Sequence, residues 1–353
     1  RDPARRDRPD DGHGVSPRRR ASVAGGRNSR AEGRKGREQS MSYSRALALV
    51  LRSMKDVAPA DRPGHRRLRL KLCLAAARHG PALAALSATP SPALSRILEE
   101  RPQTVAGLLV WPYLCAAWGV GERLRRIGAH YRIVDRLGAP LPFAADQRLV
   151  LADLSDLWPG LAVVLDQPPW FMREGGLTIS LFVADFRAYS LAFSFTEAAG
   201  DGGIDCLIGA LQGRQDDAAA DLYRDLTKAA HGLRPRDLLI EIGRILCRHW
   251  QVRALFAVAD DYRHHRHPFF GTKTQAMQDY DAIWRDRGGV RENAHFFRLA
   301  LQSERRADEA IKPNKRSLYR RRHRFLDRLE DEIRANLPAL APQPCADRQE
   351  TGC

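Results

Sequence analysis

The order of elements in the second half of the chain constrains the fold most. Residues 177–183 and 189–195 are β-rich runs separated by five residues, a spacing typical of a hairpin. A third strand, two helices and a nearly all-apolar strand follow, at 205–211, 218–230, 235–250 and 253–259. The all-apolar strand is expected near the centre of a sheet, because both of its faces need cover. This order predicts a mixed sheet with helices packed on it.

Helical patterning dominates residues 44–137. The predicted helix 121–137 has its apolar residues on one stripe and ends before a glycine and a proline. Earlier helices are predicted at 66–79 and, separately, at 81–86, because proline favours the first turn of a helix. Two short strands and a final helix are expected at 149–154, 162–165 and 315–336.

Together these elements predict an α+β fold, with an N-terminal helical region packed on a mixed, largely antiparallel sheet that is flanked by helices. The expected parts are a disordered extension at 1–40, the helical region at 41–137, an α/β domain at 148–336 and a loose tail at 337–353. The extension has no hydrophobic face and holds twelve Arg/Lys and six Asp/Glu, a composition typical of disorder. Since the first methionine is Met41, one interpretation is a gene start set too far upstream.

The formal net charge is +16, and it is still +10 without residues 1–40. Such a surface favours an anionic partner: a lipid headgroup, a phosphate-bearing ligand or RNA. Six cysteines without a CxxC pair indicate a reducing compartment, so the expected location is the cytoplasm. The longest apolar stretch, 105–120, is interrupted by Pro112 and too short to span a bilayer, so no transmembrane segment is predicted. The oligomeric state is left open.

Two arginines are candidates for anion binding. Gln212, Gly213 and Arg214 end the strand 205–211 just before a helix, where α/β proteins often bind anions. The stretch is neither a Walker A motif nor a dinucleotide fingerprint, and a tight turn is the alternative. Arg234 precedes the helix that starts at Pro235, where its charge opposes the helix dipole unless an anion bridges the two. A structural helix corner is the alternative there.

The loop after strand 253–259 contributes Tyr262 and Arg263 to the same set. If strands 205–211 and 253–259 are parallel neighbours, both of their ends lie at one edge of the sheet, and a positive cleft is predicted there. The histidines that follow lack the spacing of a standard metal site, so no metal is predicted and the loop is interpreted as solvated. Glu174 is a weak candidate for a catalytic acid or base, with a turn carboxylate as the alternative.

A basic surface helix is predicted near the C-terminus. Between residues 312 and 328 there are eight Lys/Arg and one acidic residue. Its candidate phosphate-binding residues are Lys315, Arg316, Arg320, Arg321 and Arg322. The alternative is a helix packed on the domain by its Leu/Phe stripe, with its arginines paired to acidic residues elsewhere.

Several of these stretches, in this order, resemble the VirK/YbjX family of bacterial proteins. They are IGALQG at 208–213, TKAAHGLRP at 227–235, DYRHHRH at 261–267 and KRSLYRRR at 315–322. Shorter matches are His130-Tyr131, Glu174-Gly175, Asp279-Tyr280 with Trp284, and Gly288-Gly289. The resemblance implies links to virulence, envelope remodelling and resistance to antimicrobial peptides, and it supplies no catalytic residues. A first interpretation is therefore a basic accessory or binding protein without a cofactor, cytoplasmic and peripheral to the inner membrane.

The element order also resembles the Gcn5-related acyltransferase fold, which implies a second interpretation, an N-acyltransferase that uses acyl-CoA. That fold binds pyrophosphate at a strand-to-helix turn, but the usual Q/R-x-x-G-x-G/A loop is absent and the turn reads QGRQDD. A third interpretation is an RNA-binding protein, which rests on charge alone. Separated strands beside a cleft at Gln212–Arg214 would favour the acyltransferase, and a closed sheet would favour the accessory protein.

Overall fold

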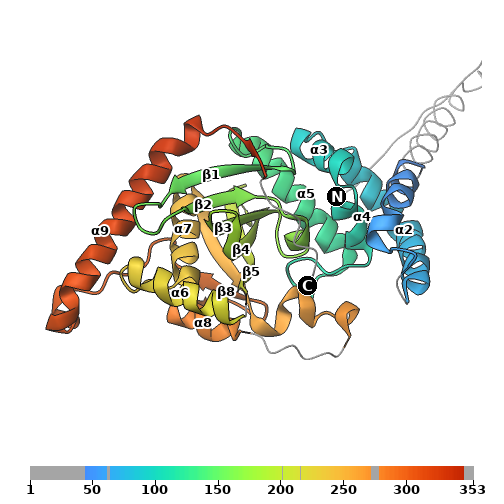
Figure 1. Ribbon diagram of the computed structural model, residues 1–353. Coiled ribbons are helices and arrows are strands. Elements are labelled where there is room, and N and C mark those ends of the chain that lie inside the picture. Colours follow the sequence, from blue (N-terminus) through green and yellow to red (C-terminus); the bar gives the residue numbers. More distant parts are fainter. Residues whose placement is uncertain (1–43, 62–63, 201, 215, 272–277, 346–353) are drawn as a thin grey trace, which may run out of the picture. The chain divides into compact units, whose positions relative to one another are not determined.

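A single nine-stranded sheet organises the described residues, which are 44–61, 64–200, 202–214, 216–271 and 278–345 in this computed structural model (Figure 1). The strand order is β7-β8-β6-β5-β4-β3-β2-β1-β9, and every neighbouring pair is antiparallel except β5 and β6. The strands are β1 (Gln147–Asp153), β2 (Leu161–Asp166), β3 (Leu177–Val183), β4 (Phe186–Glu197), β5 (Ile204–Gly213), β6 (Val252–Val258), β7 (Val290–Arg291), β8 (Phe296–Leu299) and β9 (Gln343–Pro344).

The four strands predicted at 177–259 share this sheet, so that prediction is confirmed. Almost every residue of β3, β4 and β5 is buried, which requires cover on both faces. Helix α5 (Val120–Leu137) packs on β4 from one side, and α7 (Pro235–His249) crosses β3 to β6 on the other (Figure 1). The fold is therefore α+β, with the N-terminal helices packed against the sheet.

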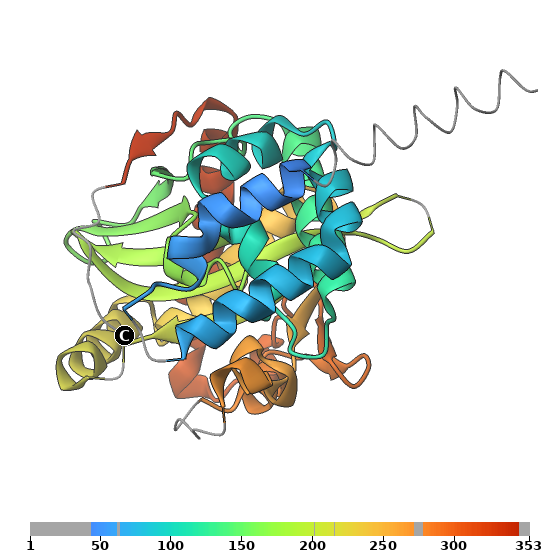
Figure 2. The ribbon, with the colours of Figure 1, turned by 90° about the vertical axis from the view of Figure 1, so that its right-hand side faces the viewer.

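The remaining helices surround these layers. They are a helix at 44–57, α2 (His65–Ser87), α3 (Pro92–Glu100), α4 (Gln103–Ala106), α6 (Asp217–Ala229), α8 (Tyr280–Asp286) and α9 (Pro313–Asn336). The helix at 44–57 and α2 lie side by side on the outside of the N-terminal region (Figure 2). The prediction of two helices at 66–79 and 81–86 is wrong, because α2 continues through Pro81. Proline removes one backbone N–H there, and packing of the flanking Leu72, Leu83 and Leu86 holds the helix together.

The apolar stretch 105–120 is buried, as expected, but only its first part is helical. It ends α4, forms one 3-10 turn at Gly107–Leu109, and then runs as irregular chain beneath α5. No helix among the described residues combines the length and the apolar character that crossing a bilayer demands.

Beyond residue 260 the structure contains two strands, β7 and β8, that the sequence analysis did not predict. β8 pairs with β6, and the two-residue β7 lies outside it. Helix α9 packs on β1 and α7 through Phe325, Leu329 and Ile333, and β9 pairs with β1. The expectations for residues 1–40 and 346–353 lie outside the described residues.

Candidate functional site

The only parallel strand pair of the described sheet separates at its C-terminal end. β5 and β6 pair from Ile204 and Val252 to Ile208 and Ala257. β5 then continues for five residues, Gly209–Gly213, while β6 ends at Val258. A β-bulge lies at the start of this extension, where β5 advances one residue more than β4. The ends of two parallel strands therefore diverge, which is where ligands collect in open α/β sheets.

The side chain of Tyr280 fills the gap between these two strands. Its hydroxyl oxygen accepts a hydrogen bond from the Leu211 amide at 2.6 Å and donates one to the Leu211 carbonyl at 2.9 Å. The guanidinium of Arg263 lies 3.5 Å from the centre of the Tyr280 ring. One buried phenol thus satisfies backbone groups of β5 that a neighbouring strand would otherwise bond.

A cluster of buried polar side chains lies beside this gap, on one face of β5. We call Glu174, Gln212, Arg263 and His264 the buried polar cluster. The Gln212 amide nitrogen donates to one Glu174 carboxyl oxygen at 2.5 Å, and His264 Nε2 lies 3.3 Å from the other. Gly209 permits this approach, because a Cβ there would overlap the carbonyl oxygen of Glu174.

Burial shifts both titratable groups of the cluster toward their neutral forms. It raises the pKa of Glu174 to about 8, against the opposing effect of the nearby Arg173 and Arg263. Burial also lowers the pKa of His264 well below its ordinary value, and the neighbouring His265 and Arg173 lower it further. Near neutral pH the Glu174 carboxyl can therefore release or take up one proton, as a catalytic acid or base must.

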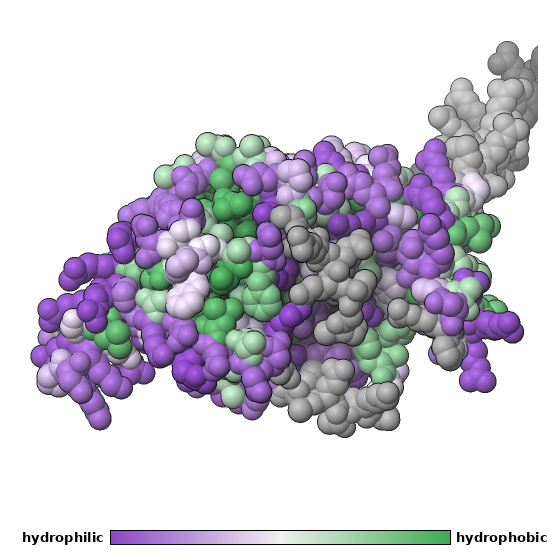
Figure 3. Space-filling view, in the orientation of Figure 1, coloured by the Kyte–Doolittle hydropathy of each residue, from purple (hydrophilic) through white to green (hydrophobic). Residues whose placement is uncertain are grey.

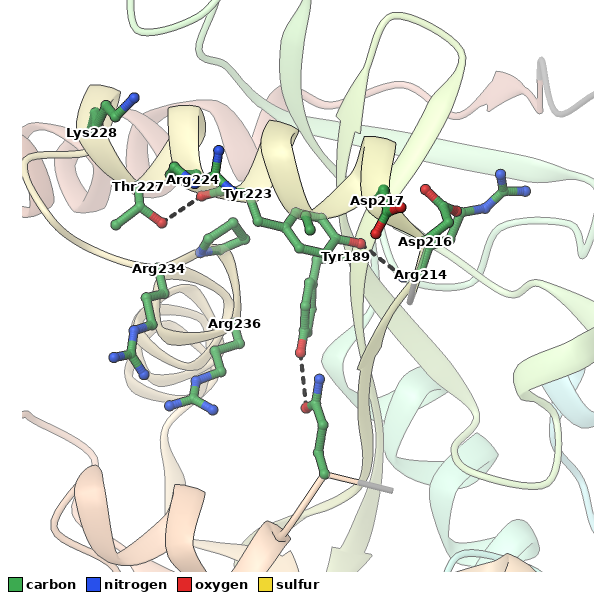
Figure 4. A pocket seen from close by; sticks show the side chains of 13 residues that line it. Tyr189, Arg214, Asp216, Asp217, Tyr223, Arg224, Thr227, Lys228, Arg234 and Arg236 are labelled. Carbon is green, nitrogen blue, oxygen red and sulfur yellow. Dashed lines mark hydrogen bonds between the residues drawn. The ribbon is translucent and has the colours of Figure 1, made fainter. Parts of the chain in front are cut away.

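A cavity of about 630 Å³ lies at the same end of β5, on the opposite face of the strand (Figure 4). Tyr189, which pairs with Gly213, lines this cavity, whereas Gln212, the residue before Gly213, points to the other face and bonds Glu174. The wall is made by one face of α6, the start of α7, Tyr189 and Gln278, whose side chains share a hydrogen bond of 3.0 Å.

Five cationic side chains line this cavity: Arg214, Arg224, Lys228, Arg234 and Arg236. Figure 4 shows Arg234 and Arg236 extending from the start of α7 on one side of Tyr189, and Arg214 on the other. Two acidic side chains, Asp216 and Asp217, stand at the α6 end of the same wall. At the start of α7, Arg236 lies 3.4 Å from Asp237 and 3.9 Å from Asp286, so Arg234 is the cation there whose side chain has no acidic partner among the described residues.

The five cations differ in their partners. Arg224 pairs with Asp221 at 2.7 Å, and Lys228 pairs with Asp225 at 2.8 Å. Arg214 lies over the Phe186 ring, 5.1 Å from its centre. Arg234 is exposed, and its guanidinium has neither a hydrogen bond nor an ion pair with any described residue. It is also the N-cap residue of α7, whose first turn receives no bond from a capping side chain.

The turn after β5 uses its own amides internally. The Arg214 amide donates to the Tyr223 hydroxyl at 2.8 Å, and the Asp216 carboxylate accepts from the Ala219 amide at 2.8 Å, capping α6. Because these two amides are already bonded, an anionic ligand in the cavity would meet cationic side chains rather than these backbone N–H groups.

The structure divides the predicted site residues into two groups. Arg214 and Arg234 line the cavity, while Glu174, Gln212 and Arg263 belong to the buried polar cluster. Gly213 lies against the rings of Tyr189 and Tyr223 between them. Tyr262 is elsewhere, with its ring 4.4 Å from that of His295.

The loop after β6 differs from its prediction. The solvated-loop interpretation is wrong for His264, which is 8% exposed and reaches Glu174. His267 also turns inward, and its Nε2 lies 2.9 Å from an Arg123 nitrogen. Over the described ranges no three His, Cys, Asp or Glu side chains come close enough to hold a metal ion together.

The basic residues of helix α9 fall into two groups, those that bond to the rest of the protein and those that are exposed. Arg322 is structural, because its guanidinium donates twice to the His231 carbonyl, at 3.1 and 2.9 Å. Arg316 donates to the Ile311 carbonyl at 3.2 Å. Lys315, Arg320 and Arg321 are exposed on the outer side of the helix. This surface lies on a different element from the cavity.

Sequence reasoning did not single out Tyr280, Tyr189 or Gln278 as site residues. Tyr280 stands thirteen residues after His267, at the start of the short helix α8. Their one available signal was position, because each lies at or just beyond the end of a strand or loop at the same sheet edge. Which of these side chains contact one another depends on the register in which β4 pairs with β5.

Comparisons with known proteins agree on one family. The profile of a family described as a protein of unknown function (DUF535) matches residues 62–335. An uncharacterized protein of Haemophilus influenzae is 28% identical over 222 residues, which are 61% of this chain and 72% of that protein. The uncharacterized protein YbjX of Escherichia coli is 30% identical over 162 residues, 46% of this chain and 49% of its own length.

A second Haemophilus influenzae protein, also uncharacterized, is 34% identical over 131 residues, 37% of this chain and 43% of that protein. This chain thus spans about half the length of two of these three relatives. No solved structure matches. Since the family profile covers the sheet, the cavity and the buried polar cluster together, the chain belongs to the DUF535 family, the VirK/YbjX family of bacterial proteins of unknown function.

Proposed function

We propose that this protein is an acyltransferase that takes an acyl group from a phosphate-bearing thioester, such as acyl-CoA, and transfers it to an amine. One observation carries the proposal. The single parallel strand pair of the described sheet separates beside a cavity lined with cations, with an ionisable carboxyl on the other face of the same strand end. The resemblance of the element order to the Gcn5-related acyltransferase fold points to the same chemistry.

The donor's phosphates are best matched to the start of α7. The side chain of Arg234 has no acidic partner there among the described residues, while Asp216 and Asp217 repel phosphate from the start of α6. The absence of the usual glycine-rich turn is consistent with this choice, because the amides of Arg214 and Ala219 are already bonded to side chains of this protein. The thioester arm then approaches along the cavity face of β5, since Tyr280 fills the gap between β5 and β6.

The buried polar cluster supplies the proton acceptor. The acceptor amine attacks the thioester carbonyl carbon, a C–N bond forms, and the C–S bond breaks. In this proposal the amine approaches from the face of β5 that carries the buried polar cluster and gives its proton to the Glu174 carboxylate. The thiolate leaves on the cavity side and is protonated from solvent. Gln212 orients the carboxyl through its hydrogen bond, and His264 lies against the second oxygen. A pKa of about 8 makes the carboxylate form a stronger proton acceptor than an ordinary glutamate.

Calorimetric titration with CoA and acyl-CoAs of several chain lengths tests the binding half of this proposal. Thiol release in the presence of a panel of amines tests the chemical half. We expect Glu174→Gln to retain CoA binding and to lose turnover, and Arg321→Ala on α9 to match the wild type in both measurements. The proposal fails if no CoA derivative binds and no thiol is released with any amine.

A non-enzymatic binding protein is the second candidate, and the exposed cations of α9 favour it. Lys315 and Arg321 lie outside the cavity, and the side chain of neither has a hydrogen bond or an ion pair within the described part of the chain. For this candidate the partner is RNA or another polyanion. Oligonucleotide binding that Arg321→Ala weakens, together with an absence of thiol release, would favour it over the acyltransferase.

A further inference from the structure

The two outermost N-terminal helices expose most of the large apolar side chains found on the described surface. Of six such residues, four lie on these helices: Leu47, Leu51, Leu70 and Leu74, which are 52%, 58%, 61% and 62% exposed. The other two, Trp170 and Val290, are on separate elements. Scattered single apolar residues are normal on a protein surface, but here four of the six fall on two neighbouring helices (Figure 2), and we call these four leucines the patch.

Each pair of leucines is spaced to project from one side of its helix. Leu47 and Leu51 are four residues apart in the helix at 44–57, and Leu70 and Leu74 are four apart in α2. The opposite side of α2 is buried through Leu72, Ala76 and Leu83 against the rest of the domain. α2 is therefore apolar on both sides, one covered by the protein and one left outside.

Positive charge borders this patch, and negative charge is nearly absent. Helix α2 contains no Asp or Glu over its 23 residues. Arg67, Lys71 and Arg78 are exposed next to the leucine row, and none of them has an acidic partner within the described residues. Over the sequence 44–87 there are nine Arg/Lys and two Asp. We call the four leucines and these three cations the N-terminal face; Figure 2 shows the two helices that carry them.

Figure 3 shows the edge of this face, where green apolar side chains lie among purple hydrophilic ones at the right of the view. Exposed leucines flanked by Lys and Arg are the pattern of helices that lie in the interface of an anionic bilayer. Apolar side chains enter the headgroup boundary there, and the cations meet anionic lipids.

We propose that the N-terminal face docks on an anionic lipid bilayer surface. Charge complementarity selects this occupant. A second copy of this chain presents the same cations to Arg67, Lys71 and Arg78, and residues 1–40, with twelve Arg/Lys and six Asp/Glu, carry charge of the same sign. The inference is independent of the proposed acyl transfer, because it uses neither the cavity nor the buried polar cluster.

Vesicle co-sedimentation of the full chain tests the proposal. We expect binding to phosphatidylcholine vesicles with 30 mol% phosphatidylglycerol and little binding to phosphatidylcholine alone. Each cation near the surface contributes roughly fivefold to partitioning. The variant R67Q/K71Q/R78Q and the variant L70Q/L74Q should therefore each lower the partition coefficient at least tenfold. Because all five positions are exposed, thermal midpoints should stay at the wild-type value.

Two matched controls keep the result specific. Val290→Gln changes an exposed apolar residue elsewhere, and R321Q/R324Q/R328Q removes three exposed cations from α9. Both should bind vesicles within twofold of the wild type. Equal loss in the α9 variant, or equal binding to neutral vesicles, would overturn the proposal.

The other occupants have their own signatures. A dimer in light scattering that L70Q/L74Q converts to a monomer would assign the face to a second copy. Faster amide exchange within residues 1–43 in L70Q/L74Q, with no vesicle binding by the wild type, would assign it to that segment. Either result would refute docking on a bilayer.

Discussion

The phenol of Tyr280 bonds both backbone groups of Leu211, accepting from the amide at 2.6 Å and donating to the carbonyl at 2.9 Å. A side chain thereby takes the place that a strand would occupy along the free edge of β5. This contact joins α8 to the point where the parallel pair separates, so it holds together the two halves of the candidate site.

Replacing Tyr280 with phenylalanine should weaken the fold. The change leaves a buried N–H and a buried C=O without their partner, and each such group costs about 1–3 kcal/mol. We expect Tyr280→Phe to lower the free energy of unfolding by about 2–4 kcal/mol in urea titration. Tyr319→Phe is the control, since that hydroxyl has no hydrogen bond to any described residue, and it should change stability by less than about 0.5 kcal/mol.

The carboxyl of Glu174 should make stability fall with rising pH. Burial raises the pKa of Glu174 from 4.5 to about 8, so the folded state binds its proton more tightly than the unfolded state. The stability that Glu174 contributes is fully present below about pH 4.5 and is lost as the pH rises through 8. His264 acts in the opposite sense, because its lowered pKa makes stability rise with pH only up to 6.5. Glu174 therefore dominates between pH 6.5 and 8.5.

Chemical unfolding of wild type and Glu174→Gln at pH 6.5 and 8.5 measures this effect. The wild type should lose stability between the two values, and the variant should lose less, because its amide does not titrate. Glu99→Gln, an exposed control, should follow the wild type. Parallel pH dependence in Glu174→Gln and the wild type would show that another group is responsible.

The strands were predictable where both faces are buried. The run 177–183 coincides with β3, and 253–259 lies within one residue of β6, because long apolar β-branched stretches leave little choice of structure. β7 and β8 were missed, since they have only two and four residues, and they are held by pairing of β8 with β6 and of β7 with β8. Two or four residues are too few to show the alternation of apolar and polar residues that identifies a strand.

The sequence predicts which edge of the sheet carries the candidate site, but it does not predict which side chains contact one another there. The predicted cleft at Arg214 and Arg263 depends on the condition that strands 205–211 and 253–259 are parallel neighbours, and the parallel pairing of β5 with β6 meets that condition. The contact of Glu174 with Gln212 and His264 depends on the bulge at Gly209 and on a loop 38 residues upstream of Gln212. Neither feature has a local signature, because both arise from long-range packing.

Gly209→Ala should be strongly destabilising. A Cβ at this position would overlap the carbonyl oxygen of Glu174 and approach the Leu114 side chain at 2.8 Å, and the carbonyl belongs to a rigid backbone. We expect a loss of about 3 kcal/mol or more in urea titration. Gly121→Ala in α5 is the control, because nothing lies within 4 Å of its Cβ position, and it should keep or slightly raise stability.

Arg322 and Arg321 should behave differently despite being neighbours. Arg322 donates two hydrogen bonds to the His231 carbonyl, whose residue has a left-handed φ of 54°, so it fixes the corner between α6 and α7 to α9. Arg322→Ala should lower the free energy of unfolding by about 1.5–3 kcal/mol. Arg321→Ala should have an effect below about 0.5 kcal/mol in the same titration, because its side chain is exposed. Equal effects would contradict this assignment.

Arg234 should control anion binding without contributing to stability. It is the cavity arginine whose guanidinium lacks a partner among the described residues, and it stands at the uncapped start of α7, so a bound phosphate would relieve the repulsion between its charge and the helix dipole. Losing a charge-assisted hydrogen bond weakens affinity by about 1.5–3 kcal/mol, so Arg234→Ala should raise the dissociation constant for CoA roughly 10- to 150-fold.

Arg214→Ala is the informative comparison, because that guanidinium already lies over Phe186 and stands on the far side of Tyr189. If the phosphates sit at the start of α7, calorimetry should show a smaller loss for Arg214→Ala than for Arg234→Ala. Inorganic pyrophosphate should follow the same order, since it has the phosphates and no thioester arm. Unchanged CoA affinity in Arg234→Ala, or a fall in its thermal midpoint, would place the arginine in the structure of the corner and remove it from the ligand site.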